Sequence, residues 1–229
     1  MELSLETQMR AGTHFMCLAL RHALSASLMR PREGAFVHMT DESLLEEMHK
    51  DDFPALSEAL PDRTIYFTHY FHPQRHGLSG IKRICLIGFP LDSFYSDGIV
   101  YSGDGKAGPS GTRSHAARYV FRHGSPEWNL LEERMRQNAD WLGEIAENEN
   151  TLILRYEDLG GDFTATAARI EAFTGPFLHS LPAPAMNRKR SYWTRDFSGF
   201  DWQALASLNA LFGPAIARFY PEIDLPRNA

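Results

Sequence analysis

The sequence predicts a single three-layer α/β/α domain with a central parallel sheet over residues 1–229. Its length is that of one domain. Short apolar or β-branched runs alternate along the chain with longer segments of helical periodicity. No internal repeat and no linker divides the sequence. Strands that alternate with helices favour a parallel sheet that is covered on both faces.

Four short segments are predicted to be β-strands. The run at residues 83–89 is almost entirely apolar, as expected of a strand buried on both faces. Residues 64–69 are rich in β-branched and aromatic side chains. The predicted strands are residues 2–8, 64–69, 83–89 and 151–155.

Helices are predicted where apolar residues recur at helical spacing between residues that begin or end a helix. Pro31 ends the first helix. Ser125 and Pro126 begin another, and Asp162 caps the one after it. The predicted helices are residues 13–29, a short one from Asp41, one from Pro90, then 126–147, 162–175 and 201–220. A glycine-rich flexible loop is expected at about residues 102–115.

Composition and charge exclude several classes of protein. A chain that is 43% apolar and 23% charged is neither disordered nor fibrous. No apolar run is long enough for a membrane span, and no signal peptide is visible. Cys17 and Cys85 lie among apolar neighbours and are expected to be buried free thiols, so we expect a soluble cytoplasmic protein. The net charge of −6 argues against nucleic acid as a partner.

The positive charges are uneven in kind, with 19 Arg against 4 Lys. Arginine suits forked recognition of phosphate, sulfate and carboxylate. A GC-rich genome explains the same bias equally well, so composition allows an anion-handling enzyme without requiring one.

The turn between the first strand and the first helix is a candidate anion site. Over residues 10–14, Arg10 offers a charge, Gly12 allows close approach of the backbone, and Thr13 adds a hydroxyl at the positive end of the helix. The segment is not a Walker A loop, because it lacks Gly-x-x-x-x-Gly-Lys-Ser/Thr. A purely structural turn remains the alternative.

Two more candidates follow predicted strands, at the sheet edge where open α/β sheets bind ligands. His69 ends the strand at 64–69 and can accept a proton from a hydroxyl near neutral pH. The alternative is a structural role for this histidine. His69 also forms a cluster with His72 and His76, but the spacing of the three residues matches no reliable metal-binding motif. Ser96, one turn into the helix that begins at Pro90, can bind a second phosphate.

These three motifs, in this order, resemble the sulfotransferases that use 3′-phosphoadenosine 5′-phosphosulfate. In that family a turn of the type Pro-Arg/Lys-Ser-Gly-Thr holds the 5′-phosphosulfate, and residues 10–13 are similar to it. A Thr-His pair supplies the base in many cytosolic members, and Thr68-His69 resembles that pair. The family's 3′-phosphate motif is Arg-x-Pro-x-Asp-x-x-x-Ser, and residues 90–96 fit its last seven positions.

Three later segments extend the resemblance, which spans the chain from about Arg10 to Tyr220. Residues 152–159 resemble the family's Tyr-Glu-Asp-Leu segment, and residues 169–175 resemble the helix end that follows it. Residues 188–193 resemble a degraded form of the Arg-Lys-Gly…Trp element that closes over the 3′-phosphate.

The resemblance implies a P-loop-like fold, transfer of a sulfuryl group, and adenosine 3′,5′-bisphosphate as the product, without a metal. His69 is then the general base, and Arg10 stabilises charge on the departing phosphate. The implied cofactor-binding residues are Arg10, Ala11, Gly12, Thr13, His14, Ser96, Arg188, Lys189 and Arg190. The implied acceptor is a hydroxyl of a small molecule or glycan, with a glycan, a lipid headgroup and a phenolic metabolite all left open. Six aromatic residues either face the acceptor or, as the alternative, belong mostly to the core: Tyr70, Phe71, Tyr101, Tyr119, Phe121 and Trp128.

Three positions depart from the family pattern. Met9 replaces the proline of the turn, Ala11 replaces its serine, and Gly88 replaces the arginine expected beside the 3′-phosphate. Arg83 or the basic run at 188–190 are the candidates to compensate for Gly88. The departures keep two alternatives open: a catalytically impaired sulfotransferase-like binding protein, or another phosphate-handling α/β transferase such as a nucleotide kinase with an atypical loop.

Overall fold

A computed structural model describes residues 1–39, 58–78, 80–101, 119–183 and 197–225. The chain divides into two compact units. The first comprises Met1–Gly88 and Ala146–Arg188, and the second comprises Phe89–Ile145 and Lys189–Ala229. The predicted helix from Asp41, the loop at 102–115 and the basic run at 188–190 lie outside the described residues. The expectation of one domain stays a prediction.

The first unit contains a six-stranded sheet in the order β3-β2-β4-β1-β5-β6. All neighbouring strands pair in parallel except β2 and β3, which are antiparallel. The predicted α/β class with a mostly parallel sheet is therefore confirmed. The strands are β1 Glu2–Thr7, β2 Ser27–Arg32, β3 Ala35–His38, β4 Thr64–His69, β5 Lys82–Ile87 and β6 Thr151–Arg155.

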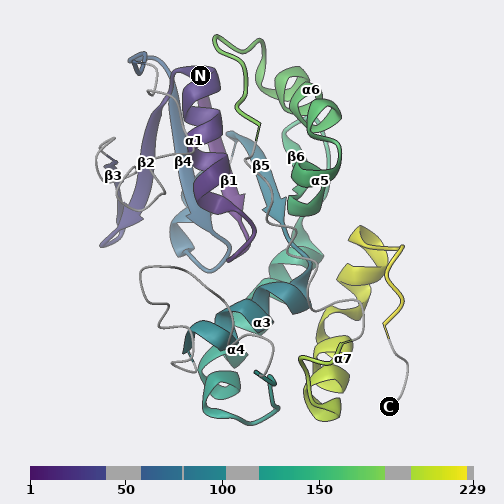
Figure 1. Ribbon diagram of the computed structural model, residues 1–229. Helices are drawn as coiled ribbons and strands as arrows, with labels where there is room; N and C mark the ends of the chain where they lie inside the picture. Colours follow the sequence, from purple (N-terminus) through teal and green to yellow (C-terminus); the bar gives the residue numbers. More distant parts are fainter. Residues whose placement is uncertain (40–57, 79, 102–118, 184–196, 226–229) are drawn as a thin grey trace. The chain divides into compact units, whose positions relative to one another are not determined.

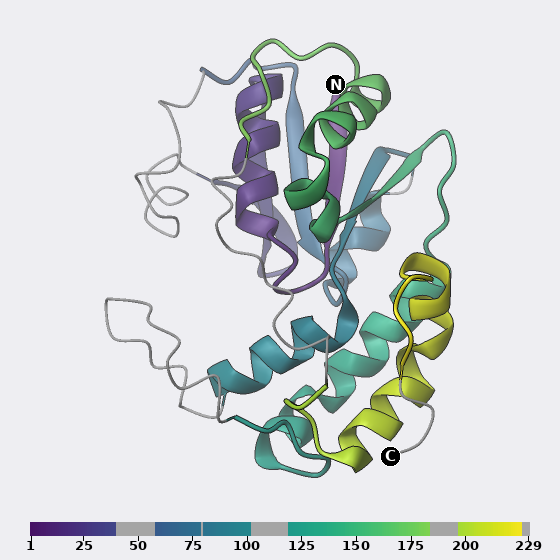
Figure 2. The same ribbon diagram turned by 45° about the vertical axis from the view of Figure 1, so that its right-hand side comes forward.

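One face of this sheet carries the hydrophobic core. Side chains alternate along each strand, and the parallel register aligns Leu5 of β1 with Phe67 of β4 and Ile84 of β5 on the same face. Helices α1 (Thr13–Leu24), α5 (Tyr156–Gly161) and α6 (Phe163–Thr174) contribute to the same cluster of buried residues (Figures 1 and 2). Cys17 and Cys85 are buried free thiols, as predicted.

The first predicted helix is too long, because residues 25–29 are not helical. Ser25, at the end of α1, adopts the left-handed conformation (φ 48°), and its N–H bonds back to the carbonyls of the last turn. Ser27 then begins β2, which pairs with β4. Leu24 and Leu28 are four residues apart and both buried, so helical spacing suggested one helix where a turn and a strand occur.

The second unit is helical in its described part. Its helices are α3 (Pro90–Tyr101), α4 (Pro126–Glu144) and α7 (Trp202–Phe219). The predicted start at Ser125 is confirmed, since its side-chain oxygen accepts from the N–H of Trp128 at 3.1 Å. Aromatic side chains dominate the core of this unit, with Phe121 packed against Trp128 and Phe200. Helix α4 ends three residues before its predicted end at residue 147.

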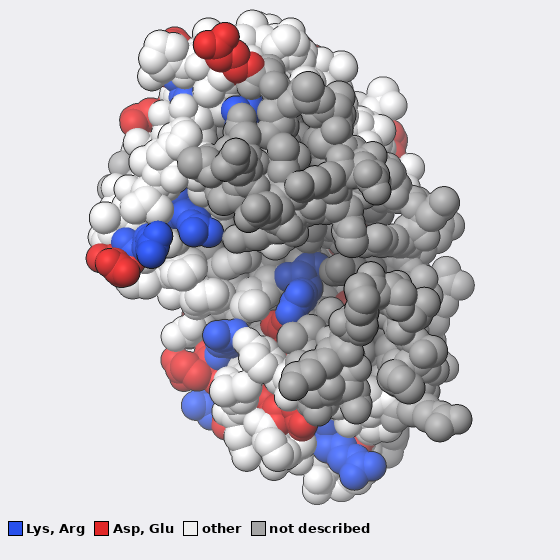
Figure 3. Space-filling model, turned by 60° about the vertical axis from the view of Figure 1, so that its left-hand side comes forward, with Lys and Arg blue, Asp and Glu red and all other residues white. Residues whose placement is uncertain are grey.

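Charges of both signs occur on the face drawn in Figure 3. On the face drawn in Figure 3, lysine and arginine lie interspersed with aspartate and glutamate and form no continuous basic area among the described residues. Within the described part of the chain, no helix has both the length and the apolar character needed to cross a membrane.

Candidate functional site

The turn between β1 and α1 has an unusual backbone and an uncapped helix start. Arg10 and Gly12 both have positive φ, 61° and 74°. Gly12 is the N-cap of α1, and no side chain caps this helix end. The first turn of α1 also carries no acidic residue, so the positive helix end and its main-chain N–H groups are not neutralised by an acidic or capping side chain.

Gly12 is required at this turn for a second reason. A Cβ at this position would overlap the aromatic ring of Tyr156, at 2.6 Å from Cδ2 and closer still to Cε2. Tyr156 begins α5 directly after β6. The backbone of the turn is thus held against an aromatic face, which a side chain at position 12 would push away.

A chain of short contacts joins the turn to His69. The Thr13 hydroxyl donates to Oγ1 of Thr7 at 2.9 Å, and Oγ1 of Thr7 lies 2.9 Å from Nδ1 of His69. The parallel register places Thr7 opposite His69 at the ends of β1 and β4. The turn and the predicted base, about 60 residues apart in sequence, therefore share one small cluster at the carboxyl edge of the sheet.

The surroundings of His69 keep its imidazole neutral. The pKa of His69 is lowered from 6.5 to about 4, chiefly by burial. The neighbouring His72 contributes to this lowering, His14 and Arg10 contribute less, and a hydrogen bond with the Thr7 backbone opposes it. The ring also stacks on Phe71, with centroids 5.5 Å apart. At neutral pH one ring nitrogen of His69 is therefore unprotonated.

The remaining predicted cofactor residues have different environments. Arg10 and His14 are exposed, whereas Ala11 is fully buried and presents no polar side chain. Ser96 lies half-buried in α3, in the second unit. Arg188, Lys189 and Arg190 lie outside the described residues. The structure thus joins His69 to the turn, while the roles of Ser96 and the basic run stay predictions.

Gly88 occupies the position where the resemblance expects an arginine. The side chain of Gln8 binds the backbone of Gly88. The Gly88 N–H donates to Oε1 of Gln8 at 3.0 Å. Arg83 does not substitute for the missing arginine, because its guanidinium pairs with the buried carboxylate of Glu6 at 3.5 Å. Sequence reasoning overlooked Gln8 and Thr7. Both residues lie at the end of a strand that was predicted to belong to a parallel sheet, and this position could have identified them as site residues.

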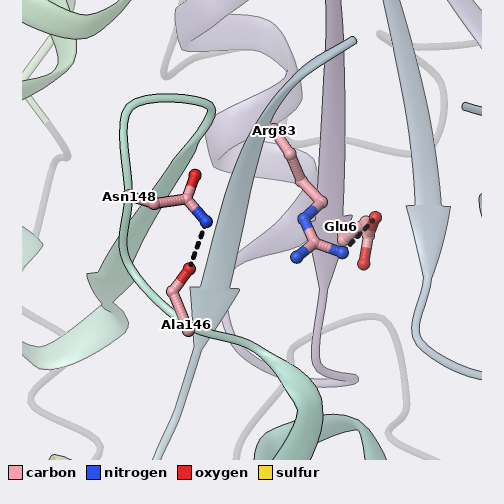
Figure 4. A network of polar contacts seen from close by, with 4 residues as sticks. All are labelled: Glu6, Arg83, Ala146 and Asn148. Carbon is pink, nitrogen blue, oxygen red and sulfur yellow. Dashed lines mark hydrogen bonds and ion pairs between the residues drawn. The ribbon is translucent and has the colours of Figure 1, made fainter. Parts of the chain in front are cut away.

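The Glu6–Arg83 pair (Figure 4) borders a polar hollow of about 770 Å³, which residues of β1, β5 and the start of β6 also line. Arg75 of the 3₁₀ helix η2 (Pro73–Leu78) lines it as well. Glu6 is only 2% exposed and its charge is paired. Among the described residues, no group of three or more His, Cys, Asp or Glu is arranged to hold a metal ion.

The aromatic residues expected to face an acceptor separate into two groups. Tyr70, Phe121 and Trp128 are buried in the cores and are not available to a ligand, which corrects the expectation for these three. Phe71 is half-buried and stacks on His69, and Tyr119 is half-buried as well. Tyr101 is 39% exposed.

The molecule is therefore an α/β protein with a candidate anion-binding turn next to a neutral histidine. Its fold is that of the sulfotransferases. The chain is similar to mouse sulfotransferase SULT7A1 complexed with PAP, with a TM-score of 0.52 and 16% identity over 96% of this chain and 85% of that chain.

Two other solved structures are similar to the chain. The sulfotransferase from Alicyclobacillus acidocaldarius has a TM-score of 0.48 and 15% identity, covering 97% of this chain and 96% of that one. The sulfotransferase domain from the curacin biosynthetic pathway has a TM-score of 0.39 and 12% identity, covering 75% and 72%. No protein-family model matches the sequence, and no curated protein matches it significantly.

Proposed function

We propose that this protein is a sulfotransferase that moves a sulfuryl group from 3′-phosphoadenosine 5′-phosphosulfate to a hydroxyl of a small molecule or glycan. The observation that carries the proposal is the cluster in which Thr7 lies 2.9 Å from both Thr13 and Nδ1 of His69. This cluster brings a neutral base to the positive end of α1. The sulfotransferase fold, and the PAP with which the mouse sulfotransferase is complexed, support the choice of cofactor.

The residues of the turn fit a 5′-phosphosulfate. The start of α1 has neither a side-chain cap nor an acidic residue in its first turn. When bound, the cofactor supplies an activated sulfuryl group, which passes to the acceptor oxygen as the bond between sulfur and the 5′-phosphate oxygen breaks. The main-chain N–H groups of Gly12 and Thr13 and the charge of Arg10 then stabilise the departing phosphate.

His69 accepts the proton of the acceptor hydroxyl through its unprotonated nitrogen. Such a base contributes roughly 10²–10⁴ in rate. Ser96 and the basic run at 188–190 are proposed to hold the 3′-phosphate. Asp92, in the first turn of α3, orients that helix start, because a carboxylate repels an anionic cofactor.

A thermal-shift titration with adenosine 3′,5′-bisphosphate tests the binding half of the proposal. At 100 times Kd a ligand stabilises the folded protein by about 2.7 kcal/mol. We expect Arg10→Ala to weaken the affinity about 10- to 100-fold, from the loss of a charged hydrogen bond of about 1.5–3 kcal/mol. The matched control is Arg32→Ala, an exposed arginine at the end of β2. Stabilisation by ATP–Mg²⁺ alone would favour a nucleotide kinase instead.

Transfer assays on pooled acceptors test the catalytic half. His69→Ala is expected to abolish most sulfation, whereas His38→Ala, at the exposed end of β3, keeps it. Near-normal activity of His69→Ala would refute the base assignment. Cofactor binding without turnover by the wild-type protein would identify the catalytically impaired alternative.

A further inference from the structure

The hydroxyl of Thr7 occupies a position between the turn and the base. It is fully buried, and Thr13 is only 7% exposed. Oγ1 of Thr7 lies 2.9 Å from Oγ1 of Thr13, 2.9 Å from Nδ1 of His69 and 3.5 Å from the carbonyl oxygen of Thr68. A hydroxyl has one proton and two acceptor lone pairs, so these three neighbours can be assigned individually.

The contacts of Thr7 favour hydrogen on one particular nitrogen of His69. The Thr13 hydroxyl donates to Thr7 and occupies one lone pair. The carbonyl of Thr68 can only accept, so the single proton of Thr7 is directed to it. The second lone pair of Thr7 is then available to accept from Nδ1–H of His69. This assignment gives every one of the four groups a complementary partner.

We propose that Thr7 is a positioning residue that holds neutral His69 as the Nδ1–H tautomer and so leaves the lone pair on Nε2. This tautomer is assigned to the protein without ligand, whereas a role of the tautomer in catalysis rests on the proposed function. In the opposite tautomer Nε2 carries the hydrogen and cannot accept a proton from a hydroxyl. When Nε2 does take a proton, Nδ1–H keeps its bond to Thr7, so the imidazolium forms without a change of partner.

The test reads the tautomer directly in the free protein by long-range ¹H–¹⁵N correlation on ¹⁵N-histidine-labelled samples. We expect a protonated, pyrrole-type Nδ1 and an unprotonated, pyridine-type Nε2 for His69. Thr7→Val removes the hydroxyl but keeps the shape, so we expect a mixture of tautomers and a lower pKa of His69. Thr7→Ser is expected to restore both. The matched control is Thr68→Val. Thr68 precedes His69, and its hydroxyl is buried and makes no hydrogen bond, so this variant is expected to leave the tautomer unchanged.

The outcomes separate this inference from the proposed function. Protonated Nε2 in the wild-type protein, or an unchanged tautomer and pKa in Thr7→Val, overturns the positioning role whether or not the protein transfers sulfate. The expected spectra without any sulfation would instead refute the proposed function and keep the tautomer. If both hold, Thr7→Val lowers kcat roughly 10- to 100-fold, by analogy with the loss of partners that orient metal-binding histidines, and Thr7→Ser recovers it. Loss of kcat without rescue by Thr7→Ser would contradict a role for the hydroxyl.

Discussion

Replacing Gly12 by alanine is expected to destabilise the protein through two separable effects. The first is conformational, because Gly12 has φ 74°, where an L-residue costs roughly 1–2 kcal/mol. The second is steric, because the new Cβ would overlap the ring of Tyr156, 2.6 Å from Cδ2. Overpacking of this kind costs roughly 1–3 kcal/mol. Together the two effects predict a loss of roughly 2–5 kcal/mol of unfolding free energy.

Gly34→Ala is the matched control for the conformational effect alone. Gly34 lies between β2 and β3 with φ 83°, and a Cβ there meets nothing within 4 Å. Its substitution is expected to cost only the first roughly 1–2 kcal/mol. Urea unfolding followed by far-UV circular dichroism gives both values. For a chain of this length, each kcal/mol of lost unfolding free energy lowers Tm by about 2–4 °C, so thermal scans provide a second measure of both losses.

A double-mutant cycle isolates the ring contact. In a Tyr156→Ala background the overlap is gone, so Gly12→Ala is expected to cost no more than Gly34→Ala does. The same variants, titrated with adenosine 3′,5′-bisphosphate, report whether the displaced turn still binds. Equal losses for Gly12→Ala and Gly34→Ala in the wild-type background, or a loss at Gly12 that persists without Tyr156, would refute the reasoning.

Three further predictions concern stability. Arg83→Met is expected to cost about 3 kcal/mol in urea unfolding, because it removes the Arg83–Glu6 ion pair, whose carboxylate belongs to a residue that is 2% exposed; a loss below about 1 kcal/mol would contradict this. Ser125→Ala removes the cap that accepts from Trp128 at 3.1 Å and is expected to cost about 1 kcal/mol in the same assay. The folded pKa of His69 is about 4 against 6.5 unfolded, so its contribution to stability is present above pH 6.5 and is lost as the pH falls towards 4. The difference in stability between wild type and His69→Gln, measured from pH 7 to 4, should therefore shrink on acidification.

Helix starts could be predicted from the sequence because they depend on neighbouring residues. Asp162 and Asp201 accept from the N–H groups of Ala165 and Ala204, as their place before a helical segment predicts. The end of α1 could not be predicted in this way. It depends on the left-handed turn at Ser25 and on the pairing of β2 with β4, a contact between distant segments.

The sequence by itself determined the residue types of the candidate site: a glycine turn ahead of a helix and a histidine at a strand end. Only the tertiary structure decided that they meet, because the register of β1 against β4 places Thr7 opposite His69. It also decided that Arg83 faces Glu6 rather than the position left by the absent arginine. Strand register and side-chain pairing are set by packing across the whole sheet, which no local pattern in the chain specifies.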